Sequence, residues 1–175
     1  LHGGEGNDFL DGGEGNDVLS GGAGDDVLED HAGDNLIDTG DGNNIVKASG
    51  GNNMVLGGAG DDQVSLGAGN DVVHAGGGND SVHAGAGTDV LFGGDGRDTL
   101  FGEADDDVID GGEGDDILSG GDGDDAIETG TGRDVVDAGA GSDNVSGTGG
   151  DKTVMAGGGD DVVTLGSGND LIDGG

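Results

Sequence analysis

A nine-residue unit repeats through this chain without insertion or deletion, and this period limits the fold more than any other feature. It is clearest in ten consecutive copies between Gly57 and Ser146, of which Gly111–Ser119 is representative. The sixth place of each of these copies is aspartate, and the eighth place is Val, Ile or Leu. The same frame extends in both directions, so that nineteen copies run from Gly3 to Asp173. A carboxylate and an apolar residue recur together, which predicts a function distributed along the chain.

Each copy divides into a turn and a short strand. Its first six places are rich in glycine, which adopts positive φ at little steric cost, and the fourth place is glycine in every copy except that of Asp105. The last three places predict a minimal strand whose middle side chain points to one face. All nineteen middle residues are Val, Ile or Leu, so this face is the expected core. Helix is excluded because a nine-residue period does not maintain a 3.6-residue face and glycine is too frequent.

The first place of the following copy points inward again if the strand continues. This explains why the first glycine is often replaced by an apolar residue: Ala75, Ala84, Ala138, Ala156, Leu66 or Leu165.

Composition excludes several classes of function. A net charge of −35, with only Lys47, Arg97, Arg133 and Lys152 as basic residues, argues against binding nucleic acid or inserting into an anionic membrane. The chain has no cysteine and no apolar run long enough to span a bilayer, and its first residues do not begin a secretory signal. High charge and low hydrophobicity would also fit disorder, but the strict period favours a fold.

One nine-residue unit cannot bury its own apolar face, so units must stack. The pattern G-G-x-G-x-D-x-U-x, with U aliphatic, resembles the calcium-binding nonapeptide repeats of the RTX (repeats-in-toxin) family over the whole chain. The resemblance implies an all-β, right-handed parallel β-roll with two facing sheets, in which two copies make one coil of 18 residues. It also implies calcium between turns one coil apart, held by sixth-place carboxylates and turn carbonyls. RTX-like proteins are typically exported by type I secretion with a C-terminal signal, which these residues do not contain.

A physical argument supports the same metal. If residues 18 apart stack at roughly 4.8 Å, Asp80 lies over Asp98 and Asp98 over Asp116. Each such contact costs about 3 kcal/mol at an effective dielectric near 20, and a divalent ion between the carboxylates reverses the sign. Calcium accepts several oxygen ligands in flexible geometry, whereas magnesium demands stricter geometry and zinc prefers His or Cys.

Ten stacked pairs join Asp to Asp, so about ten or more calcium ions are expected. The expected calcium carboxylates are Asp8, Asp26, Asp62, Asp71, Asp80, Asp89, Asp98, Asp107, Asp116, Asp125, Asp134, Asp143 and Asp161. The resemblance also implies carbonyl ligands at second and fourth places, namely Gly58, Gly60, Gly67, Gly69, Gly76, Gly78, Gly85, Gly87, Gly94, Gly96, Gly112, Gly114, Gly121 and Gly123.

The remaining sixth places form weaker sites. Asp17 stacks against the neutral Asn35, and Asp170 stacks against the basic Lys152. The run of turns with Asn35, Asn44 and Asn53 is expected to be empty or weakly occupied, because an amide supplies an oxygen but no charge. The other residue, Lys152, falls between Asp134 and Asp170. Its ammonium can replace metal on both sides through salt bridges, unless this copy has merely drifted.

Calcium binding is expected to be coupled to folding. The apolar face is small for the number of residues that must be ordered, and carboxylate repulsion opposes coiling. We therefore expect the metal-free chain to be disordered and calcium to fold it.

Other candidate sites are less favourable. His74 and His83 are nine residues apart and hence expected on opposite sheets, which disfavours a histidine metal site. No stretch resembles H-E-x-x-H or G-x-S-x-G, so no catalytic residue is expected. Leu56, His74 and Phe92 should stack on one outer face, and His83 and Phe101 on the other. These residues mark an interface or are simply good strand formers.

The sequence thus predicts a single RTX-type β-roll domain over residues 1–175, and the lack of terminal caps suggests a piece of a longer polypeptide. The expected function is a non-catalytic, calcium-dependent folding and scaffolding module of a larger secreted or cell-surface protein, with a bacterial source. The alternative is a self-associating segment of a surface layer, adhesin or filament, joined through coil ends or an apolar sheet exterior.

Overall fold

The computed structural model describes all 175 residues, which form an all-β solenoid of parallel strands without helix. The strands alternate between two ten-stranded sheets. The odd-numbered sheet contains β1 (His2–Glu5), β3 (Val18–Ala23), β5 (Leu36–Asp41), β7 (Met54–Leu56), β9 (Val72–Gly77), β11 (Val90–Asp95), β13 (Val108–Glu113), β15 (Ala126–Glu128), β17 (Asn144–Ser146) and β19 (Val162–Thr164). The even-numbered sheet contains β2 (Phe9–Asp11), β4 (Val27–Asp30), β6 (Ile45–Ala48), β8 (Gln63–Ser65), β10 (Ser81–Ala86), β12 (Thr99–Ala104), β14 (Ile117–Asp122), β16 (Val135–Ala140), β18 (Thr153–Met155) and β20 (Leu171–Asp173).

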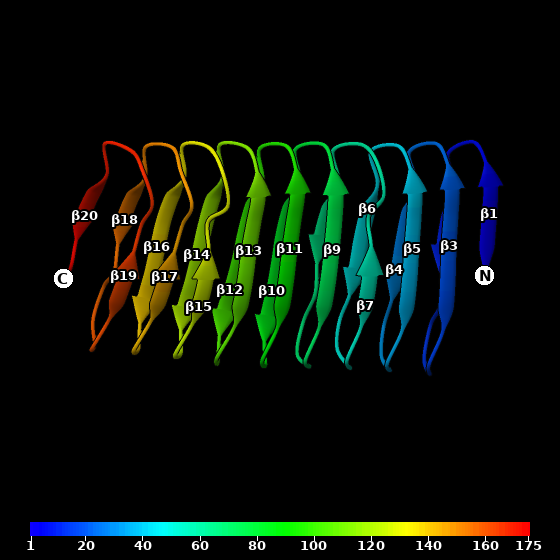
Figure 1. The fold of residues 1–175 in the computed structure, drawn as a ribbon. Helices are drawn as coiled ribbons and strands as arrows, with labels where there is room; N and C mark the ends of the chain where they lie inside the picture. Colours follow the sequence, from blue (N-terminus) through cyan, green and yellow to red (C-terminus); the bar gives the residue numbers. More distant parts are fainter.

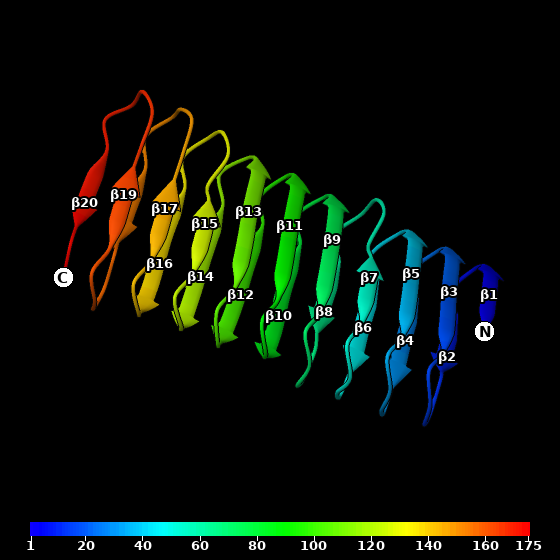
Figure 2. The same ribbon diagram turned by 60° about the horizontal axis from the view of Figure 1, so that its bottom comes forward.

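The strand register confirms the expected coil of 18 residues. Leu91 of β11 pairs with Val73 of β9 on one side and Ile109 of β13 on the other. The even sheet follows the same spacing, with Leu100 of β12 beside Val82 of β10. Coils follow one another along the axis, and the two termini lie at opposite ends (Figures 1 and 2).

The core is a thin layer between the two sheets. Eighth-place residues from Leu10 to Val154 are buried and form one continuous cluster. First-place residues such as Ala75 and Ala138 are also fully buried, which confirms that this place points inward. In the last coil, Ile172 is 49 % exposed because no further coil covers it.

Many strands are longer than the expected three residues. β11 runs for six residues, through the last three places of one copy and the first three of the next, with alternating burial. Strand pairing continues past the ninth place because the first place of the next copy points inward. The third place of that copy still pairs with the neighbouring coils. After the short strand β7, for example, Ala59 forms isolated bridges with Asp41 and Gly77.

The outer faces carry the expected stacks of side chains. The rings of His74 and Phe92 stack at 4.6 Å on the odd sheet, and those of His83 and Phe101 stack at 4.6 Å on the even sheet. The two histidines therefore lie on opposite sheets, as expected. None of the elements is a helix of the length and hydrophobicity that crossing a membrane requires.

Candidate functional site

Glycine-rich turns connect the two sheets along two edges. Turns of the first edge lead from an odd strand to the next even strand and lie at the top of Figure 1. Their sixth places run from Asp8 to Asp170. Turns of the second edge lead from an even strand to the next odd strand, and their sixth places run from Asp17 to Asp161.

The sixth-place side chains form a ladder along each edge. The backbone N–H of Asp80 donates to Oδ1 of Asp98 at 2.9 Å, and the N–H of Asp98 donates to Oδ1 of Asp116 at 2.9 Å. The same bond recurs along both edges except at Asp134, whose partner one coil later is Lys152. Each sixth-place carboxylate therefore leans toward the preceding coil, and residues 18 apart do stack.

The second oxygen of these carboxylates has no hydrogen-bond donor. Asp89 and Asp98 are fully buried, yet their Oδ2 atoms are unpartnered. A buried polar group without a partner costs free energy, and a buried charge costs more. The sixth-place aspartates with such an oxygen are Asp8, Asp26, Asp71, Asp80, Asp89, Asp98, Asp107, Asp116, Asp125, Asp143 and Asp161.

Burial also changes the acidity of this ladder. Desolvation, with added repulsion from Asp89 and Asp125 in the neighbouring coils, raises the pKa of Asp107 to about 7. Desolvation likewise raises the pKa of Asp80 to about 6, with added repulsion from Asp98 and Asp62. The stacked carboxylates thus resist ionisation together, as expected for like charges brought close in a buried site.

The fourth-place carbonyls add further oxygen atoms to each turn. No backbone N–H outside the strands donates to a fourth-place carbonyl oxygen. These carbonyls point along the solenoid axis, since a Cβ atom added to Gly78 would overlap the carbonyl oxygen of Gly60. Gly78 also has a φ of 135°, so glycine is needed here for both conformation and space. The one exception, Asp105, adopts the expected left-handed conformation with a φ of 77°.

The second-place carbonyls differ because they already have partners. The carbonyl oxygens of Gly58 and Gly67 accept N–H groups from Gly77 and Ala86 of the next coil, at 3.0 and 2.9 Å. A carbonyl has two lone pairs, so these oxygens can still bind a cation. The fourth-place carbonyls are the less satisfied of the two sets.

The side chain of Lys152 shows where a positive charge fits between turns. Its Nζ donates to the carbonyl oxygens of Gly130 at 3.2 Å and Gly132 at 2.9 Å, and it also bonds Oδ2 of Asp134. These are the second, fourth and sixth places of the preceding turn. The pair is almost fully buried. The ammonium does not bridge both sides as expected, because toward Asp170 only the backbone N–H of Lys152 donates, at 3.0 Å.

The asparagine turns satisfy the same carbonyls without a cation. The side-chain amide of Asn44 donates to the carbonyl oxygen of Gly42 at 2.9 Å, and that of Asn53 donates to Gly51 at 3.0 Å. Asn35 donates to Gly33 at 2.9 Å. Each acceptor is the fourth-place carbonyl of the same turn. The amides thus supply a donor where the aspartate turns have none.

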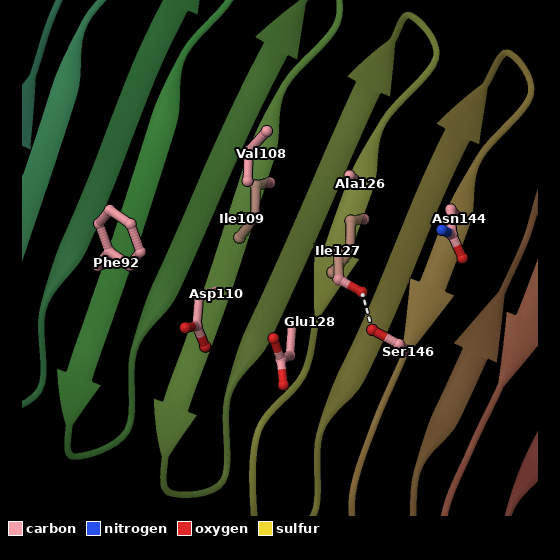
Figure 3. Close-up of a pocket in the computed structure, with 9 residues that line it drawn as sticks. All are labelled: Phe92, Val108, Ile109, Asp110, Ala126, Ile127, Glu128, Asn144 and Ser146. Carbon is pink, nitrogen blue, oxygen red and sulfur yellow. Dashed lines mark hydrogen bonds between the residues drawn. The ribbon is translucent and has the colours of Figure 1, made fainter.

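No other part of the surface has the character of a site. No group of three or more His, Cys, Asp or Glu side chains could hold a metal ion, so a cation between turns depends on backbone oxygens as well. A shallow depression of about 240 Å³ lies on the outer odd sheet, between Phe92, Glu128 and Ser146 (Figure 3). Asp110 and Asn144 also line it, but it is an open depression on a sheet face and not a cleft that would bury most of a ligand.

Two features of the turns were not predicted from the sequence. Fifth-place Asp and Asn side chains form a second, exposed ladder that runs in the opposite direction: Oδ1 of Asp25 accepts the N–H of Asn43, one coil later, at 2.9 Å. The other feature is Asp30, a buried carboxylate at a first place. The inward direction of that place was the available signal, because a buried charge needs a partner.

The comparisons with known proteins agree with the geometry. The family model described as the RTX calcium-binding nonapeptide repeat (4 copies) matches overlapping segments that together span the chain, namely 1–28, 20–55, 31–64, 48–82, 56–91, 83–118, 92–127, 119–151 and 146–175. No curated protein matches the sequence.

Proposed function

Because the chain belongs to the RTX calcium-binding nonapeptide repeat family and is a calcium-binding β-roll, we propose that its turns bind calcium as a condition of folding. In this proposal the folded coil is a non-catalytic scaffolding module of a larger secreted protein. The observation that carries it is the row of buried Oδ2 atoms without donors along both edges.

The residues present fit calcium. Sixth-place carboxylates and fourth-place carbonyls offer only oxygen, which suits a hard cation that takes six to eight oxygen ligands. Between two Asp turns, bound calcium supplies two positive charges opposite two carboxylates. The contacts of Lys152 with Gly130, Gly132 and Asp134 support the second and fourth places as the carbonyl ligands. The ten Asp–Asp pairs make about ten sites the expected number.

The coupling to folding follows from the same atoms. In the metal-free coil, stacked carboxylates such as Asp80 and Asp98 would be buried, their Oδ2 atoms would have no partner, and their charges would repel one another. The unfolded chain avoids this cost by exposing them to water. A cation that binds only the coil therefore shifts the equilibrium toward the folded state.

This coupling suits a protein that leaves the cell. Low cytosolic calcium would keep the chain unfolded, and the higher calcium outside would fold it after export. We propose an extracellular or cell-surface location on these grounds, together with type I secretion of the parent protein, which is typical of RTX proteins.

Circular dichroism in the far ultraviolet tests the proposal. The chain in chelator should give the spectrum of a disordered polypeptide, and millimolar calcium should produce the spectrum of a β-sheet. Magnesium at the same concentration is the control, because it loses water reluctantly and requires octahedral geometry. A complete sheet spectrum in chelator would refute the coupling, and an equal response to magnesium would refute the choice of metal.

A second candidate function is self-association through the outer odd sheet. The neighbouring strands β5 and β7 of this sheet expose Leu36, Met54 and Leu56, each between 37 and 44 %. Contiguous apolar patches of this kind mark interfaces. Light scattering in calcium separates the two candidates: a discrete monomer supports the scaffolding module, and ordered polymers support a structural segment of a filament or surface layer.

A further inference from the structure

Asp30 is the only charged residue at a first place of the repeat, where the other copies have Gly, Ala, Thr or Leu. It ends strand β4 and is 1 % exposed. The sixth place of the same copy is Asn35 instead of aspartate. Compared with the common pattern of the repeat, this copy has a buried carboxylate at the first place and none at the sixth.

The two oxygens of Asp30 have different surroundings. Oδ1 accepts the backbone N–H of Ala32 at 3.1 Å and the side-chain amide of Asn35 at 2.8 Å. Oδ2 is buried and has no donor. The hydrogen bonds to Oδ1 hold the carboxylate in one orientation and leave Oδ2 as the oxygen that needs a partner.

That oxygen points toward the turn of the preceding coil. A Cβ atom added to Gly12 would overlap Oδ2 of Asp30 and would lie 3.3 Å from Oδ2 of Asp17. The two carboxylate oxygens thus border the same small space beside Gly12. Calcium takes oxygen ligands at about 2.3–2.6 Å, so one ion can reach both.

The equivalent space elsewhere on the solenoid has a different pair of oxygens. A Cβ atom on Gly3 would lie 2.6 Å from Oδ2 of Asp8 and 2.7 Å from the carbonyl oxygen of Gly21, the first place of the next coil. At Gly93 the pair is Oδ2 of Asp98 and the carbonyl oxygen of Gly111, both at 2.5 Å. In the Asp30 copy, a carboxylate oxygen lies where these turns have a neutral carbonyl.

We propose that Asp30 and Asp17 are ligands of one calcium ion between the first two turns of the second edge. The sixth-place pair here is Asp17 with Asn35, which carries one negative charge where an Asp–Asp pair carries two. Asp30 restores the second charge from the first place. This inference rests on the proposed function, because it assigns a ligand and an ion to a turn that the sixth-place rule alone makes weak.

The number of calcium ions bound per chain tests the assignment. Equilibrium dialysis at saturating calcium should find one ion fewer in Asp30→Asn and in Asp30→Gly than in the unmodified chain. Asp30→Gly restores the residue common at first places and so protects against loss of the fold, which circular dichroism checks. Asp17→Asn and the double variant D17N/D30N should also lose one ion, because both residues bind the same one. Asp34→Asn is the matched control: it removes an exposed carboxylate of the same turn and should leave the count unchanged.

The alternative to a shared ion is a proton shared between the two carboxylates. In that case the Asp30 variants would keep the calcium count of the unmodified chain, and the inference would be wrong while the proposed function stands. Loss of two ions in the double variant would also overturn it, since the residues would then serve different ions. Failure of the unmodified chain to bind calcium would instead refute the proposed function itself.

Discussion

The ammonium of Lys152 lies against Oδ2 of Asp134, one coil earlier on the first edge, and both side chains are almost fully buried. The pair occurs where ten other stacked pairs of turns place two aspartates. A tethered positive charge thus contacts the same second-, fourth- and sixth-place oxygens that we propose as calcium ligands in the other turns.

Replacing this lysine should convert the turn to a metal site. Lys152→Asp should bind at least one more calcium ion per chain, because it places a carboxylate between Asp134 and Asp170. It should also fold less readily in low calcium. Isothermal titration calorimetry measures the stoichiometry. Lys47→Asp is the control, since Lys47 is 60 % exposed and pairs with Glu29 outside the turns; this variant should gain no ion. An unchanged stoichiometry in Lys152→Asp would contradict the cation role of Lys152.

Removing one sixth-place carboxylate should weaken calcium-dependent folding. Asp98→Asn keeps the Oδ1 acceptor for the N–H of Asp80 but removes the charge beside two neighbouring sites. We expect each of the two neighbouring sites to lose about tenfold in calcium affinity, ~1.4 kcal/mol per site, which raises the calcium concentration at half-folding. A calcium titration followed by circular dichroism measures it. Asp95→Asn, an exposed neighbour with the same change of charge, should shift the midpoint little; equal shifts in both variants would argue for a general charge effect.

Two adjacent glycines should respond very differently to alanine. In Gly78→Ala, the Cβ atom meets the carbonyl oxygen of Gly60 and the residue must keep a positive φ, so we expect a loss of at least ~1–2 kcal/mol in folding free energy. A Cβ atom added to Gly77 would have no other atom within 4 Å, and the φ of this residue is not positive. Gly77→Ala should therefore be neutral or slightly stabilising. Denaturant unfolding in saturating calcium compares the two. Similar losses in both variants would mean that the fourth place is not special.

The period alone predicts most of this architecture. Nineteen aliphatic eighth places fix which face is buried, and the spacing of 18 residues brings Asp80 beside Asp98. The sequence predicts strands of three residues, whereas β11 has six. The additional three residues pair with the neighbouring coils, and this contact between coils cannot be derived from the strand preference of single residues.

The direction in which the turn side chains lean could not be read from spacing. Sixth-place side chains reach toward the preceding coil, so Lys152 meets Asp134 but cannot also reach Asp170. This direction depends on the φ and ψ angles of the turn, to which the repeat pattern gives no access. The special position of Asp30, in contrast, can be recognised in the sequence. It is an acidic residue at an inward-pointing first place, in a copy whose sixth place is Asn35.

The dependence of folding on pH follows from the raised pKa values of the ladder. In the folded, metal-free coil, desolvation raises the pKa of Asp62, Asp80 and Asp116 from the ordinary value of 3.8 to about 6, and that of Asp107 to about 7. Between these values the folded state binds more protons than the unfolded state. The stability of the metal-free coil should therefore be greatest below about pH 4 and fall as the pH rises to about 7.

Calcium should reverse this dependence, because its ligands must be ionised. We expect the sheet signal of the chain in chelator to increase as the pH is lowered from 7.5 to 5. In the same interval, the calcium concentration needed for half-folding should rise as protons compete for the aspartates. Circular dichroism at a series of pH values, with and without calcium, measures both trends. If the metal-free signal does not change between pH 7.5 and 5, or increases with pH, the buried carboxylates are not what keeps the metal-free chain unfolded.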